Sequence, residues 1–418
     1  MGRSKRAVET SRRWAPVLEG EDRDAAVEAV GEVVAALDET PPTDAFDCAM
    51  VAVLAQACGD GGLDGSASDA AAWLDRAFGR CADERPSLQL HAGALGVAWV
   101  AQHLRDRAWS LAPGEPDPTV ELDEALLAEL RSPQWHGPYD LISGLVGLSI
   151  YALDKATTSP LAEACLPELL RHLEALAETS DGGARWRNRP QHTQLGTLHT
   201  DAPVYMTGLA HGVSGVLVVL AEMVARGIEA ARAERLLRGG YAWLRAQRLD
   251  DATRAYPLYA GLGRPAAPGW CHGARGAAQA LWLSGALLDE RAWQADAVDL
   301  ATHVLQPSSG ALAADDTCLC HGDASSGLLQ HRMAMQTGDT RLFTAARAAY
   351  RDVLAHRGDR RSWGGFSYWR ERGEAAQRQH DGSFLLGSTG VALALLAAVA
   401  DTPPTWDRLL GLSSPWRP

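Results

Sequence analysis

A glycine pair with the spacing G-x-x-G recurs along this chain, each time directly before a run of small and apolar residues. The clear copies are Gly93/Gly96, Gly144/Gly147, Gly212/Gly215, Gly273/Gly276 and Gly387/Gly390. A further copy begins at Gly322 with Ser325 in the second position, and a degenerate copy without glycines fits Asp47/Met50. Successive copies begin about 46 to 68 residues apart, which suits two helices and their connections. The pattern therefore predicts seven repeats.

Two types of predicted helix alternate along these repeats. The helices that follow the glycines are apolar nearly all round, as in residues 215–221, and a helix of this kind is buried. Between them lie amphipathic segments whose apolar residues recur every three or four positions, as Leu166, Leu169 and Leu173 do. The amphipathic segments are residues 68–80, 122–130, 161–178, 229–247, 290–305 and 340–354. The chain thus alternates inner and outer helices.

Seven helix pairs can form an open solenoid or a closed ring. An open solenoid needs polar caps at its ends, whereas the last inner helix, residues 385–399, is as apolar as the middle ones. This favours an all-α fold, an α/α toroid (barrel) of seven helical hairpins whose inner helices are led by G-x-x-G turns. The glycines are expected to let these helices crowd toward the ring centre, where a Cβ would clash. We expect a single domain over residues 1–418, with repeats from about 44 to 400 and a flexible stretch over 1–20.

Charge and composition exclude several classes of function. The 418-residue chain has a net charge of −13 and no basic stripe, which argues against nucleic acid and anionic membranes as partners. The basic start, residues 1–13, lacks the apolar core of a secretory signal. The most apolar run, residues 385–400, is too short to cross a bilayer. We therefore expect no transmembrane segment and a cytoplasmic location.

Seven cysteines are spaced irregularly, which is unlike a disulfide framework. Four of them are read as small hydrophobes among apolar helical residues: Cys48, Cys58, Cys81 and Cys165. Cys271 and the pair Cys320-His321 stand just before the glycines of two successive repeats. Two thiolates and an imidazole can hold Zn²⁺ and leave its fourth position open, as catalytic zinc sites need. Cys318, two residues before Cys320, remains a competing ligand.

Other polar residues stand at the same level of the repeat as these candidate ligands. Asp140 lies four residues before Gly144, and His211 and His272 each directly precede a glycine. If the repeats superpose, all three side chains face the same mouth of the ring, so they are candidate catalytic residues. A neutral histidine is suited to proton transfer near pH 7, which favours catalysis over capping for His211. Asp140 can equally be the N-cap of a helix that begins at Leu141.

These residues resemble the motifs of the lanthionine synthetase C-like family, which includes the cyclases of lanthipeptide biosynthesis. The motifs are YDLISG at 139–144, GLAHG at 208–212, WCHG at 270–273 and CHG at 320–322. The resemblance runs from about residue 44 to the last inner helix and implies the toroid of seven hairpins. It also implies that Cys271, Cys320 and His321 bind zinc and that Asp140 and His211 belong to the active site.

The resemblance further implies a specific reaction. A substrate cysteine thiolate, activated on zinc, adds to the β-carbon of a dehydroalanine or dehydrobutyrine and closes a thioether ring. The resulting enolate takes a proton at its α-carbon, with His211 as the expected acid and Asp140 orienting or assisting. The expected partners are a dehydrated precursor peptide, made of leader and core, and a separate dehydratase, because no further large region is present for such a domain.

Three positions depart from the family pattern. His272 follows the first zinc cysteine, where part of the family carries tyrosine and other relatives carry histidine. The family's arginine shortly before the Trp-Cys pair has no match, because Ala267 stands there and Arg264 lies three residues earlier. Ser325 replaces the second glycine of its repeat and is followed by Ser326 instead of the usual asparagine. We expect this serine to loosen the helix start without touching a ligand.

Several alternatives stay open on the sequence. The same fold can add a small thiol such as glutathione to dehydroamino acids in proteins, or serve as a zinc-bound scaffold without turnover. Other α/α toroids include prenyltransferases and glycosidases, and a glycosidase needs paired carboxylates, for which only Asp140 and Asp323 are candidates. The long loop 181–207, which carries Arg185, Arg187 and Arg189, is either a solvated connection or a contact for the peptide.

Overall fold

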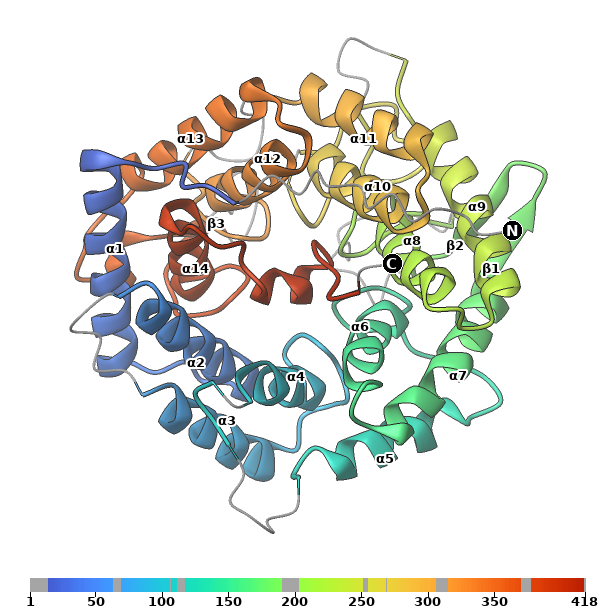
Figure 1. The fold of residues 1–418 in the computed structure, drawn as a ribbon, viewed down its shortest axis with the longest axis horizontal. Coiled ribbons are helices and arrows are strands. Elements are labelled where there is room, and N and C mark those ends of the chain that lie inside the picture. Colours follow the sequence, from blue (N-terminus) through green and yellow to red (C-terminus); the bar gives the residue numbers. More distant parts are fainter. Residues whose placement is uncertain are drawn as a thin grey trace, which may run out of the picture.

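Fourteen α-helices form two concentric rings in the described part of the chain, which confirms the predicted α/α toroid (Figure 1). The computed structural model describes residues 14–62, 69–105, 107–110, 117–189, 203–250, 255–267, 269–305, 315–369 and 377–416. The inner helices are α2 (Ala45–Asp60), α4 (Ala94–Leu104), α6 (Leu145–Lys155), α8 (Val213–Ala225), α10 (Ala274–Leu288), α12 (Asp323–Thr337) and α14 (Ser388–Val399). The outer helices are α1 (Gly20–Glu39), α3 (Ala70–Glu84), α5 (Val120–Leu130), α7 (Pro160–Leu176), α9 (Ala230–Ala246), α11 (Arg291–His303) and α13 (Thr340–Ala355).

The two ends of the repeat array meet and close the ring. Helix α1, which the repeat pattern did not predict, packs against α14 and α13 and supplies the seventh outer helix. The expected flexibility of residues 1–20 does not extend to the segment just before α1, because Trp14 and Val17 are buried. The Trp14 indole donates to the Ala397 carbonyl at 3.1 Å, and the Val17 amide donates to the Ala398 carbonyl at 2.8 Å. The start of the chain is therefore held by the last inner helix.

Backbone hydrogen bonds join the loops that precede the inner helices. In each loop, the amide of a residue two or three positions before the first glycine donates a hydrogen bond. The acceptor is the backbone carbonyl of the residue at the corresponding position in the next repeat. The bonds run from His91 to Ile142, Leu141 to Ala210, Ala210 to Cys271, Cys271 to Cys320 and Cys320 to Leu385, with N···O distances of 2.9 to 3.4 Å. The first repeat lacks the glycines, and the carboxylate of Asp47, in the first turn of α2, accepts the Phe384 amide at 2.8 Å. These loops form one face of the ring, which we call the near mouth.

The second glycine of each pair permits a tight turn. A Cβ at Gly147 would lie 2.2 Å from the Leu141 carbonyl oxygen, and one at Gly276 would lie 2.3 Å from that of Trp270. The obstacle is the same in both repeats, the carbonyl three residues before the first glycine. The loop therefore folds back onto the first turn of its own helix. This corrects the expectation that the clash would come from crowding at the ring centre.

The C-terminal segment, residues 401–416, fills the opposite face of the ring, where the inner helices end. We call this segment the strap and this face the far mouth. The strap contains the short 3₁₀ helix η4 (Trp406–Leu410), and its Leu409, Leu410 and Leu412 are buried. The Leu410 carbonyl accepts the Trp270 indole N–H at 2.8 Å, so the strap reaches the loops of the near mouth. Figure 1 shows it as the red chain that crosses the middle of the ring.

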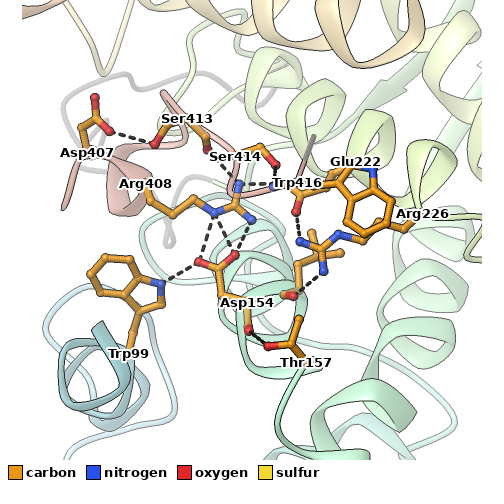
Figure 2. Close-up of polar contacts among 11 residues, drawn as sticks. Trp99, Asp154, Thr157, Glu222, Arg226, Asp407, Arg408, Ser413, Ser414 and Trp416 are labelled. Carbon is orange, nitrogen blue, oxygen red and sulfur yellow. Dashed lines mark hydrogen bonds and ion pairs between the residues drawn. The ribbon is translucent and has the colours of Figure 1, made fainter. Parts of the chain in front are cut away.

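Buried charges anchor the strap to the ends of the inner helices (Figure 2). Arg408 is 3% exposed and contacts Asp154 of α6 at 2.9 Å and Glu222 of α8 at 2.8 Å. Glu222 also pairs with Arg226, and the Trp99 indole donates to Asp154 at 2.8 Å. Burial opposes the charge of Arg408, but the two carboxylates outweigh that effect and raise its pKa. Each of these charges thus has an opposite charge beside it.

Two short antiparallel pairs are the β-structure of the described residues. Strand β1 (Ala177–Ser180) pairs with β2 (Gly183–Trp186), and β3 (Tyr368–Trp369) pairs with β4 (Arg378–Gln379). This small amount of β-structure agrees with the all-α fold predicted from the sequence. Among the described residues, no helix combines the length and the apolar character needed to cross a bilayer.

Candidate metal centre and active site

Two thiols and an imidazole meet at the near mouth, in the loops before α10 and α12. The ligand atoms of Cys271, Cys320 and His321 all lie within 4.8 Å of one another. The Cys271 amide donates to the Cys320 carbonyl at 3.2 Å, so equivalent residues of neighbouring repeats lie side by side. Cys271 is buried, whereas Cys320 and His321 are partly exposed, so the group is accessible from solvent. Such a group can hold a metal ion and leave a position for a further ligand.

A hydrogen bond between the thiols of Cys271 and Cys320 shifts their pKa values in opposite directions. A hydrogen bond with Cys320 lowers the pKa of Cys271 well below its usual value, and the neighbouring His272 and His321 lower it further against the effect of burial. The same hydrogen bond raises the pKa of Cys320, because its proton lies between the two sulfurs. Both cysteines also precede helix N-termini, whose partial positive charge favours thiolates. Two sulfurs and one nitrogen fit a borderline-soft divalent cation.

The carboxylate of Asp316 contacts the imidazole of His321. Asp316 Oδ2 lies 3.3 Å from His321 Nε2, and Asp316 Oδ1 accepts the Cys318 amide at 3.0 Å. Burial alone would raise the pKa of Asp316, but the hydrogen bond and charge of His321 lower it. A carboxylate in this position fixes the ring of a metal-binding histidine. The sequence pattern did not reveal Asp316, because it lies six residues before Gly322, outside the register of the other site residues.

Cys318 belongs to a second group of possible ligands, together with Asp316 and His321. It is fully buried, and its sulfur accepts the backbone N–H of His321 at 3.4 Å. Burial raises the pKa of the Cys318 thiol. A fully buried sulfur that already accepts an N–H serves packing better than it serves metal binding. Cys320, which is partly exposed and hydrogen-bonds with Cys271, is therefore the stronger candidate.

Asp140 and His211, predicted from the repeat register, meet at the near mouth. His211 Nδ1 lies 2.6 Å from Asp140 Oδ2. Burial works against the charged imidazole, but the hydrogen bond and charge of Asp140 outweigh it and raise the pKa of His211, with help from Cys271. The Nε2 atom of His211 is left as the nitrogen that can transfer a proton. The His272 ring lies 5.7 Å from the His211 ring, and its Nδ1 is buried with no hydrogen-bond partner in the described residues.

The backbone of His211 is held by two side chains, one of which carried no sequence signal. Asn188 Nδ2 donates to the His211 carbonyl at 2.7 Å, and Tyr139 Oη lies 3.1 Å from the same oxygen. Tyr139 Oη also lies 3.0 Å from Asn188 Oδ1, which closes the network. Asn188 is 5% exposed and follows β2 in the loop between α7 and α8. Its partners are 23 and 49 residues away, so only the fold brings them together.

The sequence matches one protein family over most of its length. Residues 62–410 match the family described as "Lanthionine synthetase C-like protein". This chain belongs to the lanthionine synthetase C-like family. The resemblance predicted from the four motifs is thereby confirmed. Among curated proteins, none matches the sequence at a significant level.

A structural comparison gives the same fold. The solved structure of a "Nisin cyclase" superposes with a TM-score of 0.69, covering 92% of this chain and 97% of that chain, at 16% sequence identity. At this identity the likeness shows the α/α toroid of the family. The identity of the metal and the reaction of this member have to be argued from its own residues.

The departures from the family pattern have different outcomes in the structure. Arg264 is exposed, and in the described residues it forms no hydrogen bond or ion pair with the site. Ser325 does not loosen its helix, because its hydroxyl accepts the Trp270 amide at 2.9 Å and lies 3.4 Å from the Cys320 carbonyl. It therefore ties together the two loops that carry the candidate ligands.

Asp140 is not the N-cap of a helix that begins at Leu141. Helix α6 begins at Leu145, and its N-cap is Gly144. Asp140 Oδ1 instead accepts the Ser143 amide at 2.8 Å, which stabilises the turn before the helix. One carboxylate oxygen therefore shapes the loop while the other holds His211.

Proposed function

We propose that this protein is a zinc-dependent lanthipeptide cyclase that forms (methyl)lanthionine rings in a dehydrated precursor peptide. The observation that carries the proposal is the position of the Asp140–His211 pair and the Cys271, Cys320 and His321 group in one mouth of the toroid. Addition of a thiol to a dehydroamino acid needs an activated thiolate and an acid for the carbanion that forms. These two groups can supply one each. Family membership supports the same reaction.

Each residue has a defined task in this mechanism. Cys271, Cys320 and His321 would hold Zn²⁺, which supplies the positive charge that deprotonates a bound substrate thiol. As the substrate sulfur attacks the β-carbon of the dehydroamino acid, negative charge moves to the α-carbon and its carbonyl. His211 then donates the proton on Nε2 to the α-carbon, while Asp140 holds Nδ1 and stabilises the charged imidazole. The proton lost from the substrate thiol returns to His211 through solvent, so the overall reaction is an isomerisation.

His272 is proposed as a second contact for the substrate in the same mouth. Its ring adjoins that of His211, and both histidines directly precede a glycine in successive repeats. Asp316 is proposed to act through His321, by keeping the imidazole in the orientation that metal binding needs.

Alkylation of a dehydrated precursor peptide tests the proposal. Cyclisation conserves the mass of the peptide, so the expected result is an unchanged mass together with core cysteines that no longer react with an alkylating agent. The His211→Asn variant serves as the control, in which the thiols stay reactive. If every thiol remains open to alkylation in the presence of zinc-loaded protein, the cyclase proposal is wrong.

A second arm distinguishes cyclisation from the addition of an external thiol. Glutathione is added to the same peptide after its own cysteines have been blocked. A cyclase is expected to leave the dehydro residues unchanged. A mass gain of one glutathione for each dehydro residue, at a rate above the uncatalysed reaction, would favour a small-thiol transferase.

A further inference from the structure

A basic pocket adjoins the Asp140–His211 pair. Its walls include Tyr139 and Asp140 from the loop before α6, and Arg187, Asn188 and Arg189 from the segment after β2. Both arginines are exposed. Within the described residues, neither has a carboxylate close enough for an ion pair. In that part of the chain, two guanidinium groups without a carboxylate partner thus line a pocket whose wall includes Asp140, the partner of the proposed proton donor.

The chain geometry places the two arginines on one side. Residue Asn188 pairs with Val204 as an antiparallel bridge, so the segment is extended there. The Asn188 side chain is bound to the His211 carbonyl and, at 2.9 Å, to the Met206 amide. Side chains two residues apart in an extended segment share a face, so Arg187 and Arg189 lie on one side of the segment, and both line the pocket with Tyr139 and Asp140. The anchor that holds the His211 backbone therefore also holds the two arginines in place.

The neighbouring charges leave this pocket positive. The Asp140 carboxylate is occupied by His211 at 2.6 Å and by the Ser143 amide at 2.8 Å. Arg185, two residues earlier on the same segment, is already paired with Glu178 at 3.4 Å and lies over the Tyr205 ring. The chain as a whole has a net charge of −13, so most of its surface repels an acidic ligand. An anion is attracted to this pocket against that background.

We propose that Arg187 and Arg189 form a carboxylate-binding subsite that holds an acidic group of the peptide next to the reacting residues. Guanidinium groups bind carboxylates through charge-assisted and often bidentate hydrogen bonds. The carboxylate comes either from an Asp or Glu side chain or from the C-terminus of the peptide, since both offer the same two oxygens. The proposal rests on the proposed function for its ligand, a peptide, but binding requires no turnover.

Protection from chemical modification tests the subsite at single-residue level. The zinc-loaded protein is treated with phenylglyoxal, which modifies free guanidinium groups, and the modified arginines are mapped by mass spectrometry. Three short acetylated Gly/Ser peptides are compared: one with a single Glu and an amidated C-terminus, one with Gln and a free C-terminus, and one with Gln and an amide. One or both acidic peptides are expected to slow modification of Arg187 and Arg189, and the peptide that protects identifies the source of the carboxylate. Equal protection by the neutral peptide, or no protection at all, would overturn the subsite.

Matched variants give a second test. The Arg187→Gln/Arg189→Gln double variant is expected to weaken binding of the protective peptide about tenfold or more, while Arg185→Gln, which removes a paired arginine nearby, changes it less than about twofold. Binding is measured by NMR diffusion, because the peptide diffuses more slowly when it is bound to the protein. Melting curves verify that both variants fold. Equal losses in the two variants would show a general charge effect and would refute the subsite. A protein that binds the acidic peptide but fails to cyclise a dehydrated precursor would keep this inference and lose the proposed function.

Discussion

The near and far mouths of the toroid are built from the same inner helices, yet their polar groups are satisfied in different ways. At the far mouth Arg408 meets Asp154 and Glu222, and each charge is closed off by an opposite one (Figure 2). At the near mouth the thiols of Cys271 and Cys320 hydrogen-bond to each other, and His272 Nδ1 is buried without a hydrogen-bond partner in the described residues. Unsatisfied polar groups cost stability unless a ligand completes them. The difference supports the proposed function, in which the near mouth carries the chemistry and ion pairs close the far mouth.

Helix direction accounts for part of this division. All inner helices begin at the near mouth, where their partial positive charge favours thiolates and anionic ligands. They end at the far mouth, where free carbonyls favour cations. Lys155 in the last turn of α6 and Arg226 at the C-cap of α8 follow that rule. Asp154 and Glu222 also lie in the last turns of these helices, where the partial negative charge disfavours carboxylates, and Arg408 compensates both of them.

The largest effect is expected from removal of a candidate metal ligand at the near mouth. Cys320→Ala leaves one thiolate and one imidazole, too few donors for tight zinc binding. We expect the zinc content measured by mass spectrometry to fall from about one per chain to near zero, and cyclisation to be abolished. Cys318→Ala is the matched control and is expected to retain zinc. If instead Cys318→Ala loses the metal and Cys320→Ala keeps it, the second ligand group is the true site.

Replacement of the proposed proton donor is expected to separate catalysis from metal binding. His211→Asn removes the acid but leaves the cysteines and His321 untouched, so zinc content should not change. Positioned general acids contribute about 10²- to 10⁴-fold to rates, and we expect a loss of that size in single-turnover cyclisation. A variant with a wild-type rate would remove His211 from the mechanism. A variant without zinc would mean that its role is structural.

At the far mouth, the comparison predicts a loss of stability without a loss of chemistry. Arg408→Met removes one of the two charged partners of the fully buried Glu222 and the ion pair of the partly buried Asp154, which is expected to lower the free energy of unfolding by about 3–5 kcal/mol in urea titrations. The zinc content and the kcat/KM of the folded fraction should stay unchanged. Arg238→Gln is a suitable control, because it breaks exposed ion pairs with Glu234 and Glu290 and should cost under about 1 kcal/mol. A stable but inactive Arg408→Met protein would contradict the assignment of stability to the far mouth and of catalysis to the near mouth.

The smallest effect concerns Asp316 behind the candidate metal ligands. Asp316→Asn keeps the size of the side chain but removes the charge that orients His321, and such changes weaken metal affinity about 10- to 100-fold. Zinc affinity is measured by competition with a coloured chelator, independently of activity. Melting temperatures of the metal-free proteins serve as a control for folding. Unchanged affinity would mean that Asp316 only supports the loop through the Cys318 amide.

Much of the fold was predictable because its signal is local. The inner helices are apolar all round and start at regular glycine turns, and both features depend on residues only a few positions apart. The parts of the fold that the repeat pattern did not predict depend on contacts between residues far apart in the chain. Helix α1 buries residues spaced at three and four, but it precedes the first repeat, so its place as the seventh outer helix follows only from its contacts with α14 and α13. The strap gave no repeat signal, because its leucines and Arg408 are satisfied by helices that end more than a hundred residues earlier.

The candidate site divides in the same way. The shared position before a glycine predicted Cys271, Cys320, His321, His211 and His272, and the same register added Asp140. Asp316 and Asn188 lie outside that register and could not be found from it. Their roles come from side-chain hydrogen bonds to His321 and to the His211 carbonyl. Arg264 was considered for the family's arginine and lies exposed instead.

The sequence by itself determined the repeat number, the alternation of inner and outer helices and the level at which soft ligands and histidines stand. These follow from periodicity, because a helix buries the residues that recur along one face. Only the tertiary structure decided which loops touch, which carboxylate holds which imidazole, and which mouth is sealed. Those outcomes depend on the backbone hydrogen bonds between successive loops and on the closure of the chain ends. The physical reason is that a hydrogen bond or an ion pair between distant residues forms only after the ring has brought them within reach.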